Sequence, residues 1–377
     1  MSPDIPDIRL PPDLLPSDGR FGSGPSKVRH DAVEALAKAA PGYMGTSHRR
    51  PGVRSVVGRL RAGLGELFSL PDGYEVVLGN GGATVFWDAA TFGLIERRSQ
   101  HLAFGEFSAR FAAGVAAAPH LEAPDVIQSE FGTHPEAQAA AGIDLYALTH
   151  NETSTGVAME IVRPAGADAG SLVAVDATSA AGGLRVDPSQ FDAYYFAPQK
   201  CFGSDGGLWV ALCSPAAVDR IGRIAASDRW IPASISLAIA LDNSRLDQTY
   251  NTPALATLFL LADQVDWMCQ HGGLEWTTSR CDASAEILYG WAEAAPYARP
   301  YVPDPTQRSH VVGTVDLDES IDGTVVTGVL RANGIVDTEP YRRLGRNQLR
   351  VAMFPAIEPD DVLVLTKAVD YVVSALS

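Results

Sequence analysis

The feature that most constrains the fold is a series of short apolar runs, each followed by polar residues or glycine. The runs alternate with segments of helical periodicity, and they cover Tyr74–Leu78, Leu145–Thr149, Leu172–Asp176, Ala193–Ala197 and Leu208–Cys213. Short apolar strands between helices are typical of a mostly parallel sheet that helices cover on both faces. In α/β sheets of this kind, ligands bind beyond the carboxyl ends of the strands. The residues that follow each run are therefore the first candidates for a site.

The chain of 377 residues is long enough for two domains. Toward the C-terminus the pattern changes to isolated strands and helices at His310–Leu317, Gly323–Ala332, Gln348–Phe354 and Asp360–Leu376. We expect a poorly ordered arm over residues 1–20, a large α/β domain over residues 21–270, and a smaller α+β domain over residues 271–377. The first part of the large domain could also contribute to the small one, and a hinge is expected near Gly272–Gly273.

The net charge of −16 makes nucleic acid and anionic membranes poor partners, although a local cluster of arginines could still bind a small anionic substrate. The N-terminal residues lack the basic start and apolar run of a signal peptide, and no uncharged apolar run reaches the roughly 18 residues of a membrane span. The four cysteines include no C-x-x-C pair, so we expect reduced thiols and no metal site. These features predict a cytoplasmic protein.

Lys200 is the first candidate for chemistry, because only four of the 29 basic residues are lysines. It follows an aromatic run, Tyr194–Phe196, at a place where burying an ammonium group is costly. A lysine amine can condense with the carbonyl group of a cofactor, which would explain a lysine there. The alternative is a lysine at a strand end whose amine reaches solvent.

Asp176 is the second candidate, because it ends an apolar run at the edge where a ligand would bind. Pyridoxal phosphate acts as an electron sink only while its ring nitrogen stays protonated, and an aspartate partner keeps it so. Asp176 and Lys200 are 24 residues apart in sequence, which leaves room for one connection and one further strand. The alternative is an aspartate that caps the next helix.

The glycine-rich segment Gly79–Thr84 follows the first run and precedes a predicted helix over Thr84–Leu94. Glycines let the backbone approach an anion, and a helix N-terminus offers free N–H groups and a favourable dipole. The segment matches neither G-x-G-x-x-G nor the lysine-containing P-loop, so an ordinary turn is the alternative. Further candidates are Phe107 for stacking on a planar ring, Thr153 for a ring oxygen, and Asn251 with Thr252 for phosphate. For each of these a core position or a helix cap is the alternative.

Arginines cluster in two places, one around His48 and Arg49 and the other near the C-terminus. The second cluster consists of Arg342, Arg343, Arg346 and Arg350. Arginine binds carboxylate and phosphate groups with a bidentate fork, so such clusters in an acidic protein favour an anionic substrate. Arg350 lies inside an apolar strand, which favours a functional role, whereas a solvated charge run is the alternative for Arg342 and Arg343.

Nine strings of the sequence, in their order along the chain, resemble the phosphoserine aminotransferase family, which has the fold of type I pyridoxal-phosphate enzymes. The strings are FGSGPSK, TSHR, GNGGAT, GEFSARF, HNETSTG, VDATSAAGG, YYFAPQK, YNTPA and QLRVAMF, and the resemblance runs from about Phe21 to the end of the chain. The overall pattern resembles the actinobacterial branch most. One string alone is unspecific, but nine in order form a specific pattern.

The resemblance implies a role for each matching residue. Lys200 would form the Schiff base with pyridoxal phosphate, and Asp176 would pair with the pyridine nitrogen. The other implied cofactor contacts are Ala83 and Thr84 at the phosphate, Gln199, Phe107 on the ring face, and Thr153 at the ring hydroxyl. Asn251 and Thr252 would reach the phosphate of the other subunit's cofactor, so the active unit would be a homodimer. The implied substrate contacts are Arg49 and Arg350, with His48 assisting.

The reaction that the resemblance implies is reversible amino transfer from glutamate to 3-phosphohydroxypyruvate, which gives 2-oxoglutarate and O-phosphoserine on the route of serine biosynthesis. A second implied substrate is 3-hydroxy-2-oxo-4-phosphooxybutanoate, from vitamin B6 (pyridoxine) synthesis. Many members of the family carry a His-Arg pair for the substrate phosphate, where this chain has Arg342 and Arg343. The Pro/Asp-rich arm before Phe21 is also longer than in many relatives.

Two other interpretations remain open from the sequence. The nearer one is another enzyme of the same class, such as a serine–glyoxylate aminotransferase or a cysteine desulfurase. The four cysteines are not placed like the mobile catalytic cysteine of a desulfurase, and the arginines favour a dianionic substrate. The more distant one is a non-catalytic nucleotide-binding α/β protein with GNGGAT as its phosphate loop, which would need no lysine at position 200.

Overall fold

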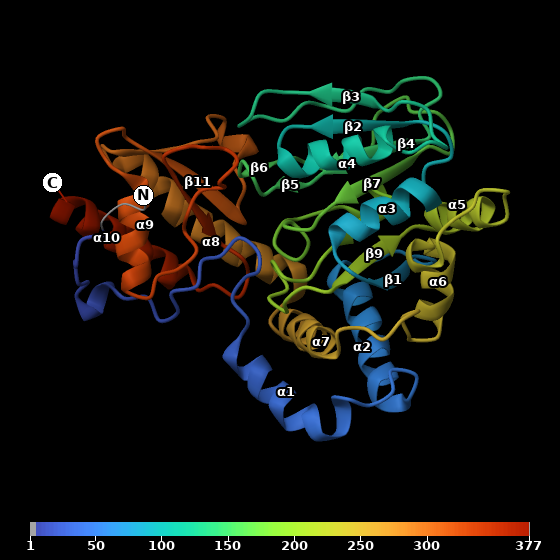
Figure 1. Ribbon diagram of the computed structural model, residues 1–377, viewed down its shortest axis with the longest axis horizontal. Helices are drawn as coiled ribbons and strands as arrows, with labels where there is room; N and C mark the ends of the chain where they lie inside the picture. Colours follow the sequence, from blue (N-terminus) through green and yellow to red (C-terminus); the bar gives the residue numbers. More distant parts are fainter. Residues whose placement is uncertain (1–4, 377) are drawn as a thin grey trace.

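The computed structural model describes residues 5–376, which form a large unit around a seven-stranded sheet and a small unit around a three-stranded sheet (Figure 1). The strands of the large sheet, in spatial order, are β1 (Glu75–Asn80), β9 (Leu208–Cys213), β8 (Ala193–Phe196), β7 (Leu172–Asp176), β4 (Leu145–Thr149), β2 (Ser99–Ala103) and β3 (Asp125–Gln128). In this sheet β9 runs antiparallel to both of its neighbours, and the other neighbouring pairs are parallel. The predicted mostly parallel α/β sheet is confirmed.

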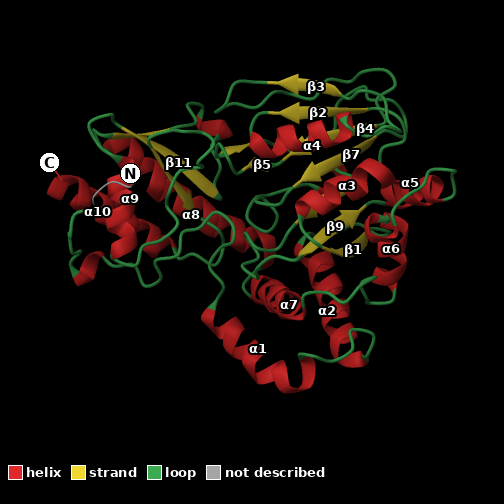
Figure 2. Ribbon diagram, in the orientation of Figure 1, coloured by secondary structure: helices red, strands yellow, loops and turns green. Residues whose placement is uncertain are grey.

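Helices cover both faces of the large sheet (Figure 2). One face is covered by α3 (Ala83–Gly93), α4 (Glu106–Ala116), α5 (Pro215–Ala225) and α6 (Leu237–Arg245). The other face is covered by α2 (Pro51–Leu67) and α7 (Leu255–Gln270), and α1 (His30–Tyr43) packs against α7. In β8, Tyr194 and Phe196 join the core under α2 and α7, whereas Tyr195 joins the core under α3. Consecutive strand residues point to opposite faces, so an entirely apolar strand needs a helical layer on each side.

The small unit contains β10 (Ala298–Pro300), β11 (Val312–Leu317) and β12 (Gln348–Ala352), which pair antiparallel in that order. The helices α8 (Gly273–Ala294), α9 (Gly323–Ala332) and α10 (Pro359–Leu376) pack with this sheet around a separate apolar core. The remaining elements are β5 (Asn151–Glu152), β6 (Val157–Ala158) and the 3-10 helices η1 (Pro12–Leu14), η2 (Pro188–Gln190), η3 (Ala233–Ile235) and η4 (Pro305–Gln307). None of the helices within residues 5–376 is long and apolar enough to cross a membrane.

The stretch expected to be a poorly ordered arm has specific contacts in residues 5–20. Leu10 is buried in the core of the small unit, and its N–H donates to Asn333 Oδ1 at 3.0 Å. The N–H of Ser17 donates to the carboxylate of Asp361 at 2.6 Å. The proline and aspartate content suggested disorder, but a few apolar side chains between them are enough to attach the segment to the small unit. Residues 1–4 of the expected arm, and Ser377 of the expected small domain, lie outside the described residues.

Replacing Leu10 with alanine should destabilise the protein, because it removes a buried side chain from the core of the small unit. We expect the free energy of unfolding to fall by about 2–5 kcal/mol, the usual range for Leu→Ala in a core. Leu15→Ala is the matched control: Leu15 is 42 % exposed, so its replacement should change this free energy by less than about 0.5 kcal/mol. Urea unfolding followed by circular dichroism measures both. Equally small effects would mean that the arm does not pack against the small unit.

Candidate active site

The carboxyl ends of the parallel strands meet at one edge of the large sheet, where a cavity of about 330 Å³ lies. Asp176 is the last residue of β7, and Lys200 follows the end of the neighbouring strand β8. The cavity brings together these residues of the predicted site: Ala83, Thr84, Phe107, Thr153, Asp176, Gln199, Lys200 and Arg350. It is also lined by Gly82, from the glycine-rich segment predicted to approach an anion. The remaining lining residues had no predicted role: Ser23, Gly24, Trp87, Thr149, Asn151, Thr178, Ser179 and Tyr341.

Two hydrogen bonds hold Asp176 at the end of its strand. Its Oδ2 accepts from Trp87 Nε1 at 3.0 Å, and its Oδ1 accepts from the N–H of Thr178 at 3.0 Å. Asp176 is buried, and a buried carboxylate with neutral donors remains a strong acceptor for a further N–H group in the cavity. Trp87 lies one helical turn after Ala83, on the same face of α3, and that spacing could have identified it from the sequence.

The amine of Lys200 lies inside the cavity and not at the surface. The residue is 8 % exposed, and Nζ donates to Thr153 Oγ1 at 2.7 Å. Nζ also lies 5.3 Å from the centroid of the Phe107 ring. Burial lowers the pKa of Lys200 to about 8, while the negative charge of Asp176 opposes this shift and the positive charge of Arg350 adds to it. The alternative of an amine that reaches solvent is therefore wrong.

A glycine near the N-terminus makes room for this lysine. Gly24 has a φ of +132°, which residues with a side chain rarely adopt, and a Cβ placed there would lie 2.9 Å from Lys200 Cε. The next residues are tied to the same place, because the N–H of Ser26 donates to the carbonyl of Gln199 at 2.9 Å. Ser23 and Gly24 of the string FGSGPSK therefore form part of the cavity wall.

Several polar atoms of the lining are buried and have no hydrogen-bond partner among the described residues. They are Ser23 Oγ, Asn151 Oδ1, Thr178 Oγ1, Gln199 Oε1 and Arg350 Nε. Buried polar atoms are rarely left unpaired in proteins, so this set is suited to a polar ligand. The N-terminus of α3 opens into the same cavity at Gly82, and no side chain caps it. Its free N–H groups are suited to an anionic group such as a phosphate.

The small unit contributes Arg350 from β12 and Tyr341 from the loop before it. Arg350 Nη1 donates to the carbonyl of Thr153 at 3.5 Å, and its Cζ lies 5.3 Å from the centroid of the Tyr341 ring. The Tyr341 ring is in turn 6.0 Å from that of Phe107. Tyr341 therefore connects the arginine of the small unit with an aromatic residue of the large unit.

The other predicted arginines lie outside this cavity. Arg342 and Arg343 follow Tyr341 on its loop but do not line the cavity, and Arg343 forms an ion pair with Glu106 at the start of α4. His48 and Arg49 lie instead with Asn251 and Thr252 in a separate, largely exposed group. In this group His48 Nδ1 is 3.1 Å from Thr252 Oγ1, and Arg49 Nη2 donates to the carbonyl of Tyr250 at 3.2 Å.

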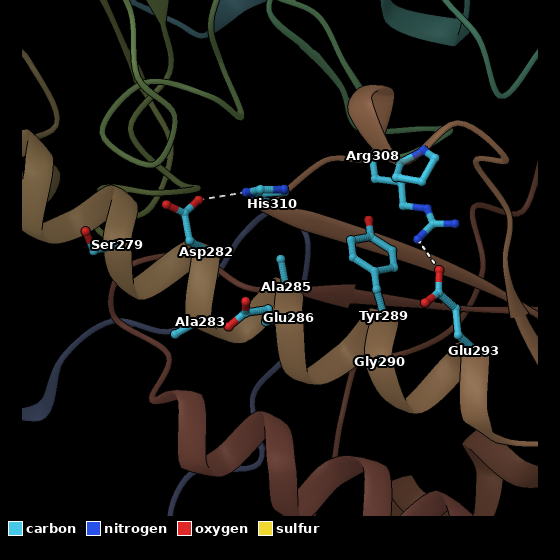
Figure 3. A pocket seen from close by; sticks show the side chains of 11 residues that line it. Ser279, Asp282, Ala283, Ala285, Glu286, Tyr289, Gly290, Glu293, Arg308 and His310 are labelled. Atoms are coloured by element: carbon cyan, nitrogen blue, oxygen red, sulfur yellow. Dashed lines mark hydrogen bonds and ion pairs between the residues drawn. The ribbon is translucent and has the colours of Figure 1, made fainter.

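A larger hollow of about 560 Å³ lies along α8 (Figure 3). Its charged side chains pair with one another: His310 Nδ1 is 2.7 Å from Asp282 Oδ1, and Arg308 Nη1 is 2.5 Å from Glu293 Oε1. It contains none of the predicted site residues, and four of its charged side chains already pair with one another, so we assign no function to it. Across residues 5–376, no group of three or more His, Cys, Asp or Glu side chains is arranged to hold a metal ion.

Comparison with known proteins identifies the chain. It matches the family model described as Aminotransferase class-V over residues 130–338. A phosphoserine aminotransferase from Nocardioides sp. is 60 % identical over 370 residues, which cover 98 % of this chain and 99 % of that protein. A putative phosphoserine aminotransferase from Mycobacterium leprae is 58 % identical over 371 residues, which cover 98 % of each chain. The fold and the cavity thus define a class V aminotransferase. Given this identity over nearly its whole length, the chain belongs to the phosphoserine aminotransferase family.

Solved structures share the fold at lower identity. A phosphoserine aminotransferase from Cytophaga hutchinsonii superposes with a TM-score of 0.84 at 24 % identity, covering 94 % of this chain and 99 % of that one. The PLP-bound phosphoserine aminotransferase from Trichomonas vaginalis has a TM-score of 0.77 at 17 % identity, covering 94 % of this chain and 99 % of that one. The expected fold of type I pyridoxal-phosphate enzymes is confirmed.

In protein freed of bound small molecules, the amine of Lys200 should titrate near pH 8, because burial disfavours its charged form. Roughly one tenth of the amine should then be neutral at pH 7, and most of it above pH 8. Competitive labelling with acetic anhydride at a series of pH values, read by peptide mass spectrometry, measures the midpoint. A midpoint near the ordinary value of 10.5 would contradict the buried position of the amine.

Proposed function

We propose that the chain binds pyridoxal 5′-phosphate around Lys200 and catalyses amino transfer from glutamate to 3-phosphohydroxypyruvate, giving O-phosphoserine and 2-oxoglutarate for serine biosynthesis. The observation that carries the proposal is a buried lysine amine of lowered pKa that shares one cavity with Asp176. The names of the relatives at 58–60 % identity support the substrate. The PLP-bound structure from Trichomonas vaginalis supports the cofactor.

We assign Lys200 to the carbonyl carbon of the cofactor, Asp176 to its ring nitrogen, and Phe107 to one face of its ring. When bound, pyridoxal phosphate supplies a carbonyl group for the lysine amine and a ring that accepts electron density. A carboxylate at the ring nitrogen keeps that nitrogen protonated, and the bonds from Trp87 and the Thr178 N–H hold the carboxylate in place. An aromatic side chain over the ring would fix its plane.

The phosphate of the cofactor is assigned to the N-terminus of α3 at Ala83 and Thr84, together with Gln199. The free N–H groups and dipole of the helix favour an anion there, and the side-chain amide N–H group of Gln199, which lines the same cavity, would donate to it. The hydroxyl of Thr153 is assigned to the ring hydroxyl of the cofactor. Thr153 Oγ1 also accepts from Lys200 Nζ, so one side chain would contact both the cofactor and the lysine.

In the reaction the amine of Lys200 has two successive tasks. With pyridoxal phosphate bound, it would hold the cofactor, and as a free amine it would be placed to move a proton at the substrate Cα. A pKa near 8 suits this task, because general acid–base catalysis is most efficient when the pKa lies near the working pH. Such proton transfer contributes about 10²–10⁴-fold to the rate.

The anionic ends of the substrate are assigned to arginines. Arg350 would hold the carboxylate, because its Nε is buried and unpartnered while the Tyr341 ring lies against its guanidinium. We assign the substrate phosphate to the loop with Arg342 and Arg343, acting together with His48 and Arg49 of the partner subunit. A dianionic phosphate requires several positive groups, and Arg342 and Arg343 directly follow Tyr341, which lines the cavity.

We further propose that the active unit is a homodimer with shared sites. Asn251 and Thr252 lie outside the cavity of their own chain and would reach the phosphate of the partner's cofactor. Large apolar side chains flank this group and are exposed: Met44 by 42 %, Leu246 by 55 % and Tyr250 by 44 %. Clustered exposed apolar side chains mark interaction surfaces, which supports a second copy of the chain at this place.

Two narrower assignments complete the proposal. The keto acid 3-hydroxy-2-oxo-4-phosphooxybutanoate also carries a phosphate and a carboxylate, so the same arginines would accept it and give the enzyme a part in vitamin B6 synthesis. We place the enzyme in the cytoplasm, because its four cysteines are free thiols.

Lys200→Ala should abolish both covalent attachment of pyridoxal phosphate and amino transfer. Attachment is measured by borohydride reduction and peptide mass spectrometry, and turnover by an assay with glutamate and each phosphorylated keto acid. We expect turnover to fall by at least about 10²-fold. Lys38→Ala, in the exposed part of α1, is the control and should keep both properties. Unchanged attachment in the Lys200 variant, or a wild-type protein that accepts neither keto acid, would contradict the proposed function.

Arg49→Ala and Lys200→Ala should complement each other when the two chains are co-expressed. If Arg49 serves the neighbouring site, a hybrid dimer contains one site in which both residues are intact. Random assortment makes half of the dimers hybrid, so the mixture should regain about one quarter of the wild-type activity. The assay is turnover of 3-phosphohydroxypyruvate, compared with each variant expressed alone. No gain on co-expression would mean that the sites are not shared in this way.

A further inference from the structure

Glu152, in β5, is completely buried, and the assignments above give it no role. Its Oε2 accepts from the N–H groups of Phe107 at 3.1 Å and Ser108 at 2.9 Å, and from the Ser108 hydroxyl at 3.0 Å. Its Oε1 accepts from the N–H of Ser154 at 3.1 Å and from the Ser154 hydroxyl at 2.7 Å. All five donors are neutral, and within residues 5–376 the carboxylate forms no ion pair.

The carboxylate is stable in this place because it lies at the N-terminus of α4. The N–H groups of the first helical turn have no partners within the helix, and the helix dipole favours a negative charge beside them. Gly105 allows the close approach, since a Cβ there would lie 2.2 Å from Glu152 Cγ. The strings GEFSARF and HNETSTG therefore meet in one structure, with Gly105 and Ser108 from the first and Glu152 and Ser154 from the second.

Both neighbours of Lys200 Nζ depend on this carboxylate. Phe107, whose ring lies 5.3 Å from Nζ, is bound to Glu152 through its own N–H. Thr153, whose hydroxyl accepts from Nζ at 2.7 Å, is the next residue along the chain and lies between Glu152 and Ser154. One buried side chain thus joins the helix that carries the aromatic ring to the segment that carries the hydroxyl.

We propose that Glu152 is a positioning residue of the active site, which fixes Phe107 and Thr153 around Lys200 and keeps a negative charge near its amine. This inference rests on the proposed function, because it is that function which makes Phe107 and Thr153 contacts of pyridoxal phosphate. Glu152 itself touches neither the cofactor nor the substrate in this assignment.

The charge of Glu152 acts on Lys200 together with three other groups. Asp176 and Glu152 raise the pKa of Lys200, Arg350 lowers it, and the thiol of Cys201 raises it slightly, against the larger lowering caused by burial. Removing the charge of Glu152 should therefore move the midpoint of Lys200 to a lower pH. Shortening the side chain while keeping its charge should leave the midpoint of Lys200 close to that of the wild type.

Three variants of the full-length chain separate these effects. Glu152→Gln keeps the shape but loses the charge and turns an amide N–H group toward donors. Glu152→Asp keeps the charge but shortens the side chain. Glu106→Gln is the matched control, because Glu106 precedes Phe107 on the same helix but pairs with Arg110 and Arg343. The measurements are the dissociation constant of pyridoxal phosphate, the visible circular dichroism of the bound cofactor, and the labelling midpoint of Lys200.

We expect both Glu152 variants to bind pyridoxal phosphate about tenfold more weakly or worse, with altered visible circular dichroism per bound cofactor. The labelling midpoint of Lys200 should fall in Glu152→Gln and stay in Glu152→Asp. The control should match the wild type within about twofold in affinity. A Glu152→Gln protein that is only less stable to heat, with wild-type affinity, dichroism and midpoint in its folded form, would overturn the inference.

If the Glu152 variants do not fold, Ser154→Ala tests the inference instead. It removes one hydrogen-bond donor to Glu152 Oε1 and leaves the charge of Glu152 in place. Weaker cofactor binding with altered dichroism would support the inference, and wild-type values of both would overturn it. Failure of the proposed function gives a different result. In that case the wild-type protein itself would not bind pyridoxal phosphate, while the labelling midpoints would still report whether Glu152 acts on Lys200.

Discussion

The burial of one lysine amine is the constraint on which the rest of the structure depends. An ammonium group removed from water is costly, and Lys200 is tolerated because a hydroxyl accepts from its Nζ and two carboxylates lie near. Each of these groups comes from a different segment. Asp176 ends β7, Thr153 and Glu152 belong to the segment after β4, and Gly24 leaves the space that the lysine stem occupies. The amine is therefore stable only when the parallel sheet has assembled around it.

The register of the sheet fixes the position of Lys200 relative to Asp176. In β8 the residues Tyr194, Tyr195 and Phe196 alternate between the two helical layers, and all three are completely buried. A slip of one residue would exchange the two faces, and neither layer has room for the wrong ring. Tyr195 is paired with Asp176 across β7 and β8, so the same register fixes how far Lys200 lies beyond the carboxylate.

Much of the large unit could be predicted from the sequence, because most strands buried on both faces are largely apolar. The interior strand β2 was not predicted, because its buried residues include Ser99, Gln100 and His101. The predicted bounds of β4, β7 and β9 agree with the structure, whereas the edge strand β3, which alternates between half-buried and exposed residues, gives no such signal. Trp87 was missed, although it follows Ala83 by one helical turn, because its partner Asp176 is distant in sequence. Tyr341 was missed because the ring that it approaches, that of Phe107, is also distant in sequence.

The arginines that we propose for the two ends of the substrate stand on different kinds of structure. Arg350 stands on β12, where its neighbours Leu349 and Val351 point into the core of the small unit, so the alternation of the strand directs the arginine toward the cavity. The small sheet is itself fixed to the site, because Thr314 on β11, which pairs with Arg350, donates to the carbonyl of Thr155 at 2.9 Å. Arg342 and Arg343 lie on a loop without such support. An anchor on a strand tolerates little change, whereas a loop can rearrange its charges.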